Sequence, residues 1–235
     1  STWDYTTMYL IEGEDKAVLI DTGTRCADLD KIVGQITGKP LEVIVTHMHP
    51  DHAGCIKYFD KVWMHRADTV LVPQHAADYQ GEFLYMEEGQ VFDLGGRKLE
   101  VAWMPGHTPG SVVLLDKANG DCYSGDAFGS GEVWLQCVPM SPIATFHESC
   151  CRMEKLMKEA HIKDIWCGHY PYLKSSLPLA YIQTMIRISH RLMNGDQEGS
   201  EPYSNYFIKM PPTARKLAEG RAMIVYDSTN IPEAR

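Results

Sequence analysis

Residues 46–54 carry the feature that most constrains this chain. They read Thr-His-Met-His-Pro-Asp-His-Ala-Gly and follow an apolar run at residues 41–45 that is typical of a buried strand. Four potential metal ligands fall within six residues: His47, His49, Asp51 and His52. A strand that ends in a tight loop can aim such side chains at one point, and zinc accepts imidazole and carboxylate ligands. The segment therefore predicts a metal site that distant parts of the chain have to complete.

Three later segments share a pattern with this loop: a strand ends, a glycine lies nearby, and a ligand-type residue follows. Those residues are His107 in Gly-His-Thr-Pro-Gly, Asp126 in Gly-Asp and His169 in Gly-His. The last two are weak signals alone, because a loop aspartate more often forms a turn or a helix cap. Together the four segments supply five histidines and two aspartates. Seven ligands are too many for one zinc ion and suit two ions that share a bridging carboxylate.

The remainder of the chain mixes predicted strands and helices. Helices are expected at residues 28–37, 145–160 and 179–193, and a short helix at 66–72 is expected to end at Pro73. Strands are expected at residues 7–12, 16–21, 41–45, 61–65, 90–94, 97–104, 111–116, 121–124, 164–167 and 222–227. An α+β chain with strands in both halves predicts a four-layer αββα sandwich, in which helices cover two facing sheets.

Several local predictions accompany this reading. Thr145 and Glu148 have the spacing of a capping box at the start of the helix at 145–160. The same helix carries a sulfur-rich stripe that is more typical of a core than of a redox or metal feature: Phe146, Cys150, Met153 and Met157. Residues 74–89 and 196–204 read as irregular loops.

Composition excludes several partners. The net charge is −9 and there is no basic block, which argues against nucleic acid because phosphate-backbone affinity comes largely from clustered Lys and Arg. No run of about 18 apolar residues is present, so no membrane span is expected. Residues 1–4 have neither a basic segment nor an apolar signal core. The seven cysteines are odd in number and form no Cys-x-x-Cys pair, which favours reduced, mostly buried thiols and a cytoplasmic protein.

The chain resembles the metallo-β-lactamase superfamily, in its glyoxalase II-like and lactonase-like branch. The resemblance rests on Tyr-Leu-Ile-Glu at 9–12, Leu-Ile-Asp-Thr-Gly at 19–23 and the four ligand segments as far as His169. It implies an αββα sandwich with the site at one edge of the two sheets. We expect residues 1–235 to form one such domain, with residues 170–235 as a C-terminal extension of helices and strands that can cover the site.

The resemblance also implies how the ligands divide between two Zn²⁺ ions, or other divalent metals such as Mn or Fe. The first ion would take His47, His49 and His107, the second would take Asp51, His52 and His169, and Asp126 would bridge them. A cysteine often stands at the position of Asp126 in zinc-dependent β-lactamases, so the chain looks like the dinuclear hydrolase branch. Flavodiiron proteins carry a glutamate where this chain has His49.

This ligand set implies a dinuclear zinc-dependent hydrolase that uses a metal-bridging hydroxide on a small ester, lactone or thioester. Asp51 is a ligand that could also hydrogen-bond the hydroxide as a catalytic residue. Asp21 either orients a ligand imidazole or caps the turn before the first helix, and the sequence leaves these two roles equal. The alternatives are a phosphodiester hydrolase, which the acidic charge disfavours, and an iron-dependent persulfide dioxygenase-like oxidoreductase.

The sequence gives the least information about the substrate pocket. Aromatic residues follow His169, and we expect Tyr170, Tyr206 and Phe207 to contact a small-molecule substrate, although ordinary packing explains them as well. Basic residues after His169 form no recognisable glutathione-binding pattern, and Cys55 replaces the second glycine usual after the lactonase motif. The other histidines are assigned to surface or structural roles: His65, His75, His147, His161 and His190. The protein is expected to be a monomer or a homodimer.

Overall fold

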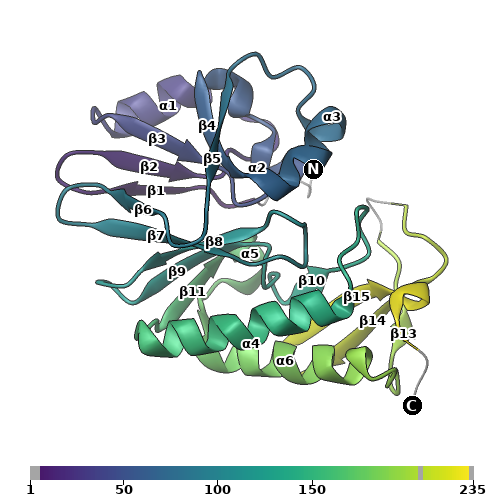
Figure 1. Cartoon of the computed structure of the whole chain (residues 1–235). Helices are drawn as coiled ribbons and strands as arrows, with labels where there is room; N and C mark the ends of the chain where they lie inside the picture. Colours follow the sequence, from purple (N-terminus) through teal and green to yellow (C-terminus); the bar gives the residue numbers. More distant parts are fainter. Residues whose placement is uncertain (1–5, 206–208, 233–235) are drawn as a thin grey trace.

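Three β-sheets form the framework of the protein, whose computed structural model describes residues 6–205 and 209–232 (Figure 1). The first sheet contains, in order, β1 (Tyr9–Glu12), β2 (Ala17–Ile20), β3 (Leu41–Ile44), β4 (Lys61–His65) and β5 (Glu82–Met86). β1 and β2 pair as an antiparallel hairpin, whereas β2 to β5 run parallel to one another. The predicted N-terminal hairpin is therefore confirmed.

The second sheet has the order β12-β11-β9-β8-β7-β6. Its strands are β6 (Val91–Asp93), β7 (Lys98–Trp103), β8 (Val112–Asp116), β9 (Asp121–Gly125), β11 (Asp164–Cys167) and β12 (Leu177–Pro178). β7, β9 and β11 run in the same direction, because β8 is antiparallel to both β7 and β9 while β9 and β11 are parallel. Their carboxyl ends therefore meet at one edge.

A smaller third sheet has the order β10-β15-β14-β13. Its strands are β10 (Glu132–Trp134), β13 (Glu201–Pro202), β14 (Ala214–Glu219) and β15 (Ala222–Asp227). β10 pairs in parallel with β15, so the segment directly after β9 joins the C-terminal part of the chain. This pairing places Trp134, at the end of β10, close to the carboxyl ends of the second sheet.

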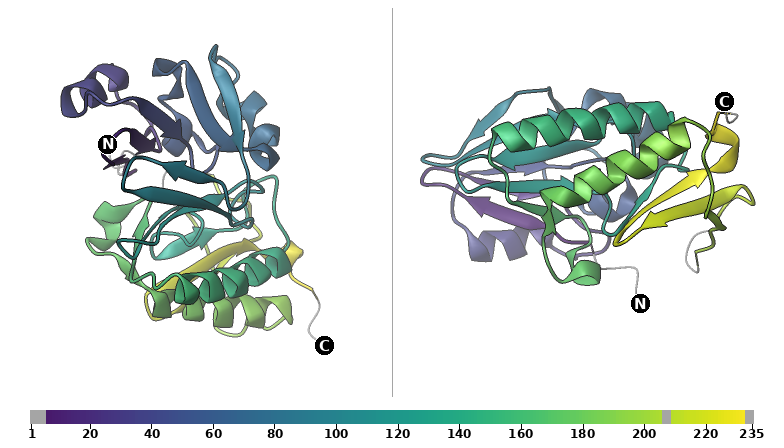
Figure 2. Two further views of the ribbon diagram at one scale, coloured as in Figure 1. Left: turned by 60° about the vertical axis from the view of Figure 1, so that its left-hand side comes forward. Right: turned by 90° about the horizontal axis from the view of Figure 1, so that it is seen from below.

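Helices cover the outer faces of the sheets (Figure 2). The α-helices are α1 (Leu29–Ile36), α2 (Pro50–Ala53), α3 (Val72–His75), α4 (Ile143–Glu159), α5 (Tyr170–Leu173) and α6 (Leu179–Met193). Short 3₁₀ helices are η1 (Ile56–Tyr58), η2 (Arg66–Leu71) and η3 (Ser228–Asn230). α4 and α6 lie side by side against the second and third sheets, and α1 lies on the far side of the first sheet (Figures 1 and 2).

The buried side chains form three clusters that separate four layers. One lies between α1 and the first sheet, one between the two larger sheets, and one between the second and third sheets and the α4/α6 pair. Successive residues of β8 divide between two of them: Val112 and Leu114 face the first sheet, while Val113 and Leu115 face the helices. This alternation follows from the twofold period of a strand. The predicted αββα sandwich is confirmed, and the sulfur-rich stripe of α4 is fully buried in the helix-side core.

Several local predictions are wrong. β5 lies inside the segment predicted as an irregular loop, because its residues are half-buried and show no clear alternation. Pro73 lies within the first turn of α3, where a missing N–H is tolerated, and does not end a helix. α4 begins at Ile143 after Pro142 and its N-cap has no side-chain hydrogen bond, so the capping box at Thr145 does not form.

Three strands of the third sheet, β10, β13 and β14, were also not predicted. They are short or carry few buried residues, and they are stabilised by pairing with β15 and with each other more than by a pattern of their own. Within the described residues, no helix is both long and apolar enough to cross a membrane.

Candidate metal centre

The seven predicted ligand residues lie together at one edge of the two larger sheets. His47 and His49 follow β3, and Asp51 and His52 lie on α2 immediately after them. The other three follow the carboxyl ends of parallel-running strands: His107 follows β7, Asp126 follows β9 and His169 follows β11. The common strand direction therefore explains why segments up to 122 residues apart in the chain converge on one place.

The side chains form two groups, and within each group one ligand atom per residue lies within 4.8 Å of the others. The first group is His47, His49 and His107, and the second group is Asp51, His52, Asp126 and His169. This division agrees with the one that the family resemblance implies, with Asp126 placed in the second group. No third group of this kind is found among residues 6–205 and 209–232.

In the first group the three imidazoles face one another. His49 Nδ1 lies 2.9 Å from His107 Nε2, and the His47 ring centroid lies 4.8 Å from the centroids of both other rings. His107 Nδ1 donates a hydrogen bond of 2.7 Å to the Trp134 carbonyl. A neutral imidazole that donates from Nδ1 presents a lone pair at Nε2, so the third sheet fixes the orientation and the tautomer of His107.

In the second group two imidazoles surround two carboxylates. His52 Nε2 lies 3.5 Å from Asp126 Oδ1 and 3.6 Å from Asp51 Oδ2. His169 Nε2 lies 3.1 Å from Asp126 Oδ2 and 3.3 Å from Asp51 Oδ2. Asp126 also approaches the first group, since its Oδ2 lies 4.0 Å from His107 Nε2. Its carboxylate is therefore the link between the two groups.

The donor atoms fit a metal ion better than they fit one another. His47 Nε2, His52 Nε2 and Asp126 Oδ1 are buried and have no hydrogen-bond partner within the described structure. Buried polar atoms are rarely left unsatisfied in native proteins, and an ion is one explanation when they converge. Imidazole nitrogens with carboxylate oxygens are a donor set that zinc and other first-row divalent ions accept.

The electrostatics of the two groups differ. Burial and the neighbouring histidines hold the pKa of His47 well below its usual value, and burial with His107 lowers the pKa of His49 to about 3. Burial also opposes charge on His169, but the Asp126 and Asp51 carboxylates outweigh it and raise its pKa to about 10. The Asp126, Asp21 and Asp51 carboxylates likewise raise the pKa of His52 in spite of its burial. The imidazoles of the first group are therefore neutral. In the second group, His52 and His169 carry protons in the absence of a metal ion.

Asp21 supports the second group. Its Oδ2 lies 2.7 Å from His52 Nδ1, so it accepts from that ring nitrogen and leaves Nε2 turned toward Asp126. Its Oδ1 accepts from the Thr46 N–H at 2.7 Å, and its Oδ2 from the Thr46 hydroxyl at 3.0 Å. Of the two roles that the sequence left open, contact with a ligand imidazole is therefore observed.

Asp68, on η2, supports the first group and was not predicted. Its side chain is fully buried and accepts three hydrogen bonds: from the Met48 N–H at 2.9 Å, the Thr108 hydroxyl at 2.9 Å and the Gly110 N–H at 2.6 Å. Burial raises the pKa of this carboxyl to about 6, although the three hydrogen bonds work in the opposite direction. No local motif marks Asp68, because its partners lie 20 to 42 residues away in the chain.

Two glycines allow the ligand loops to approach each other. Gly125 has a φ of +48°, and a Cβ there would collide with the Thr46 side chain. A Cβ at Gly168 would collide with the His52 ring and would lie 2.6 Å from Asp126 Oδ1. The glycines in the Gly-Asp and Gly-His segments are thus explained by close packing of the ligand loops.

The predicted substrate contacts are not established. Tyr170 begins α5, where its N–H donates to Thr7 Oγ1 at 3.2 Å and its ring lies 5.8 Å from the Trp166 ring. Tyr206 and Phe207 lie outside the described residues. His75, which was assigned a surface or structural role, lies beside the first group with its ring centroid 5.9 Å from that of His49.

Comparison with known proteins agrees with this geometry. The sequence profile of the metallo-beta-lactamase superfamily matches residues 1–136. The human acyl-coenzyme A thioesterase MBLAC2 is 26% identical over 202 residues, which covers 69% of this chain and 72% of the thioesterase. The hydroxyacylglutathione hydrolase of Aeromonas salmonicida is 27% identical over 179 residues, covering 74% of this chain and 64% of that enzyme.

Solved structures show the same fold. TTHA1623 in a di-iron-bound form superposes with a TM-score of 0.61 and 26% identity, covering 77% of this chain and 93% of that one. The DIM-1 metallo-beta-lactamase superposes with a TM-score of 0.63 at 14% identity. The family profile spans more than half of the 235 residues, and it includes the histidine-rich loop at residues 46–54. The chain belongs to the metallo-beta-lactamase superfamily, and its similar proteins include named hydrolases of that fold.

Proposed function

We propose that the protein hydrolyses thioesters at a centre of two zinc ions. The observation that carries the proposal is the pair of adjacent donor groups linked by Asp126. The identity of the relatives supports the substrate class, because an acyl-coenzyme A thioesterase and a hydroxyacylglutathione hydrolase both cleave an acyl–sulfur bond. The acidic chain, with a net charge of −9, gives no support to a nucleic acid substrate.

In this proposal each donor group holds one ion. His47, His49 and His107 would hold the first, Asp51, His52 and His169 would hold the second, and Asp126 would contact both. Two such ions lower the pKa of water and polarise the carbonyl of an ester or thioester.

The protein's own groups then orient the reacting molecules. Burial and the nearby Asp126 carboxylate oppose ionisation of Asp51, but the His52 and His169 imidazoles outweigh them and hold its pKa below the usual range, so the group is ionised at neutral pH. Its side chain is 33% exposed, which makes it the most accessible member of the second group. We expect Asp51 to accept a hydrogen bond from the attacking water and thereby to orient it toward the thioester carbonyl.

We propose that the segment after β10 forms an apolar rim that takes the acyl chain. This segment starts close to the centre, because the Trp134 carbonyl accepts a hydrogen bond from His107. Burial, with the Asp51 and Asp126 carboxylates, raises the pKa of the Cys137 thiol to about 11. The same segment exposes two large apolar side chains, Val138 at 75% and Met140 at 38%. Exposed apolar groups next to a polar centre are typical of a ligand-binding rim.

The proposal is tested by kinetics on the zinc-loaded protein. A panel of acyl-coenzyme A thioesters, S-acylglutathiones, lactones, aryl esters, phosphodiesters and β-lactams should give the highest kcat/KM for a thioester, and metal analysis should give about two ions in the centre. A clear preference for any other class in the panel would refute the thioester assignment.

Iron is the second candidate for the metal, because the similar protein TTHA1623 has a di-iron-bound form. Iron colour in the purified protein, together with oxygen uptake on addition of glutathione persulfide, would replace the hydrolase proposal by an oxidoreductase one. Hydrolysis by a colourless zinc protein, with no oxygen uptake, would remove this candidate.

A further inference from the structure

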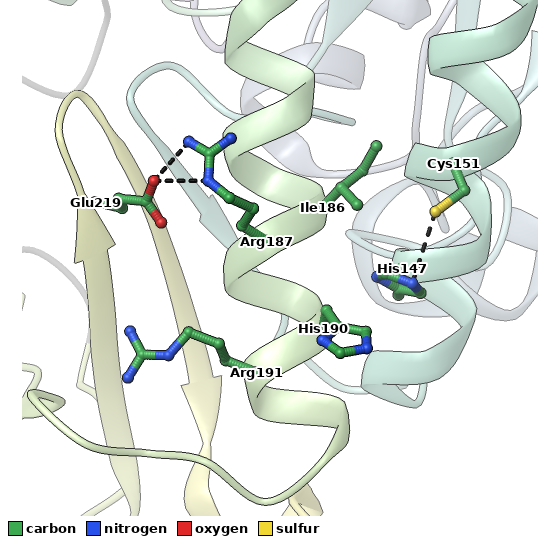
Figure 3. Close-up of a pocket in the computed structure, with 7 residues that line it drawn as sticks. All are labelled: His147, Cys151, Ile186, Arg187, His190, Arg191 and Glu219. Carbon is green, nitrogen blue, oxygen red and sulfur yellow. Dashed lines mark hydrogen bonds and ion pairs between the residues drawn. The ribbon is translucent and has the colours of Figure 1, made fainter.

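A cavity of about 480 Å³ lies between α4 and α6, and none of the seven donor residues lines it (Figure 3). α4 contributes His147 and Cys151 to its lining. α6 contributes Ile186, Arg187, His190 and Arg191, and β14 contributes Glu219. Cys151 and His190 are exposed, and three of these side chains are potential ligands for a soft metal ion.

His147 and Cys151 already have the separation that a shared ion requires. They are four residues apart on α4, so they lie on the same face of the helix. Cys151 Sγ lies 3.6 Å from His147 Nε2 (Figure 3). Zinc bonds of about 2.3 Å to sulfur and about 2.0–2.1 Å to nitrogen, at a tetrahedral angle, place the two donor atoms about 3.6 Å apart.

A buried serine fixes the orientation of the His147 ring. His147 Nδ1 lies 3.0 Å from Ser189 Oγ, while the Ser189 hydroxyl donates to the Met185 carbonyl at 2.7 Å. The Ser189 hydroxyl hydrogen is therefore engaged in the bond to Met185, and the hydroxyl oxygen accepts a hydrogen bond from His147 Nδ1–H. This leaves the lone pair of Nε2 turned toward Cys151. A hydrogen bond from the distal ring nitrogen is the usual support of a histidine that binds a metal.

His190 supplies a third donor across the helix pair. Its ring centroid lies 5.6 Å from that of His147, and two imidazoles on one tetrahedral ion have centroids about 5 Å apart. The ligand atoms of His147, Cys151 and His190 do not all lie within 4.8 Å of one another in the structure, so the exposed His190 ring, which contacts Asn194, would have to rotate toward the His147/Cys151 pair when an ion binds. The two arginines of the cavity do not oppose a cation, because Arg187 pairs with Glu219 at 2.8 Å and Arg191 pairs with Asp196 at 2.7 Å.

We propose that His147, Cys151 and His190 form a peripheral binding site for a soft divalent cation such as Zn²⁺, which links α4 to α6. The Cys151 thiol loses its proton when the ion binds, and solvent completes the fourth position. The site is independent of the catalytic centre, since it shares no residue or element with the two donor groups.

Titration with Co²⁺ tests this site separately from the catalytic centre. A thiolate bound to Co²⁺ gives an intense near-ultraviolet charge-transfer band, and neither donor group of the catalytic centre contains a cysteine. We expect the band to grow as a third equivalent of Co²⁺ binds to the full-length wild-type protein. Cys151→Ser should abolish the band, and His147→Ala should weaken Co²⁺ binding at this site by at least tenfold.

Matched variants separate the site from other thiols and histidines. Cys26→Ser removes a partly exposed thiol elsewhere, and His161→Ala removes an exposed histidine outside the cavity, so both should keep the band. Hydrolysis should be unchanged in Cys151→Ser. Saturation at two equivalents without a band, or a band that persists in Cys151→Ser, would overturn the proposal. Neither result would affect the proposed hydrolase.

A second inference concerns Asp68 and rests on the proposed metal centre. Met48 stands between two ligand-type residues, and Thr108 directly follows His107, so Asp68 ties together the two loops that carry the first group. These are the loops that place His49 Nδ1 and His107 Nε2 2.9 Å apart. We infer that Asp68 is a positioning residue for the first ion.

Asp68→Asn is the sharpest variant, because it keeps the shape but turns an amide NH₂ toward one of three donors. We expect the affinity for one of the two ions to fall about 10- to 100-fold, with the other ion retained. The matched control is Asp116→Asn, which removes a fully buried carboxylate that pairs with Arg97 and Asn119 away from the centre. The control should lower Tm without changing metal affinity.

The outcomes distinguish the inference from the proposed function. Wild-type affinity for both ions in Asp68→Asn, or an equal loss in Asp116→Asn, would overturn the positioning role alone. A wild-type protein that binds no divalent ion at this edge would overturn both the positioning role and the proposed function.

Discussion

The two donor groups of the metal centre lie side by side but have opposite electrostatic character. The first group consists of three imidazoles whose pKa values are lowered by burial and by one another. The second contains two ionised carboxylates, and these raise the pKa values of His52 and His169 above their usual range. The first group therefore offers neutral donors, whereas the second group gains most from a bound cation.

The supports of the two groups differ as well. Asp21 contacts a ligand-type imidazole of the second group directly, whereas Asp68 acts on the first group through backbone and hydroxyl groups of its loops. A direct contact orients one ring, and a contact to two loops sets the distance between rings. The comparison predicts that the two aspartates affect different ions.

Removal of Asp126 should have the largest effect, because its carboxylate is the only one that approaches both described groups. We expect Asp126→Ala to lose at least one ion and to lower kcat/KM on the order of 10³-fold, since metal activation is worth several kcal/mol and 1.36 kcal/mol is tenfold. Metal analysis and thioester kinetics measure this. Asp121→Ala, at the other end of β9, is the control. Full activity in Asp126→Ala would refute the role of the Asp126 carboxylate as the link between the two donor groups.

Asp21→Asn should weaken the ion of the second group about 10- to 100-fold, because the His52 ring loses its carboxylate partner. Competition with a chelator on the two-metal protein measures the two affinities. Asp21→Asn should weaken binding of the ion in the second group, whereas Asp68→Asn should weaken binding of the ion in the first group. The same ion weakened in both variants would contradict the separate supports.

The metal-free protein should become less stable between pH 7 and pH 10, because of the second group. The folded-state pKa of His169 is about 10, above its ordinary value of about 6.5, so its stabilising contribution is fully present below about pH 6.5. That contribution is lost as pH rises through about 10. Thermal melts should show a falling Tm for the metal-free protein and a flatter profile for the zinc-loaded one. If Tm falls equally with pH in both forms, the protonated His169 imidazole does not stabilise the second group in place of a metal ion.

Val138→Ser should have the smallest effect, since Val138 is a rim residue that is 75% exposed. We expect KM for long-chain thioesters to rise a few-fold with kcat unchanged, because only part of a valine burial energy of about 1.5–3 kcal/mol is at stake. Short-chain thioesters serve as the internal control. An equal rise for both chain lengths would argue against an acyl-binding rim.

Much of the fold followed from local pattern. The helix at residues 179–193 and the strands at 61–65, 164–167 and 222–227 were predicted with their observed bounds, because each has a clear apolar period between turn signals. β5 and the strands around β15 were not predicted, because their burial depends on which neighbours they pair with. Pairing partners are a property of the whole fold.

The sequence by itself determined which seven residues converge at the metal centre, because each follows a strand end with a glycine nearby and the ligand types are chemically distinctive. Only the tertiary structure showed how they are held. The Trp134 carbonyl, Asp21 and Asp68 reach their partners across 20 to 42 residues of chain, and carbonyls or aspartates carry no local signal of such contacts. Residue types determine which side chains can bind a metal, whereas long-range packing determines how those side chains are oriented.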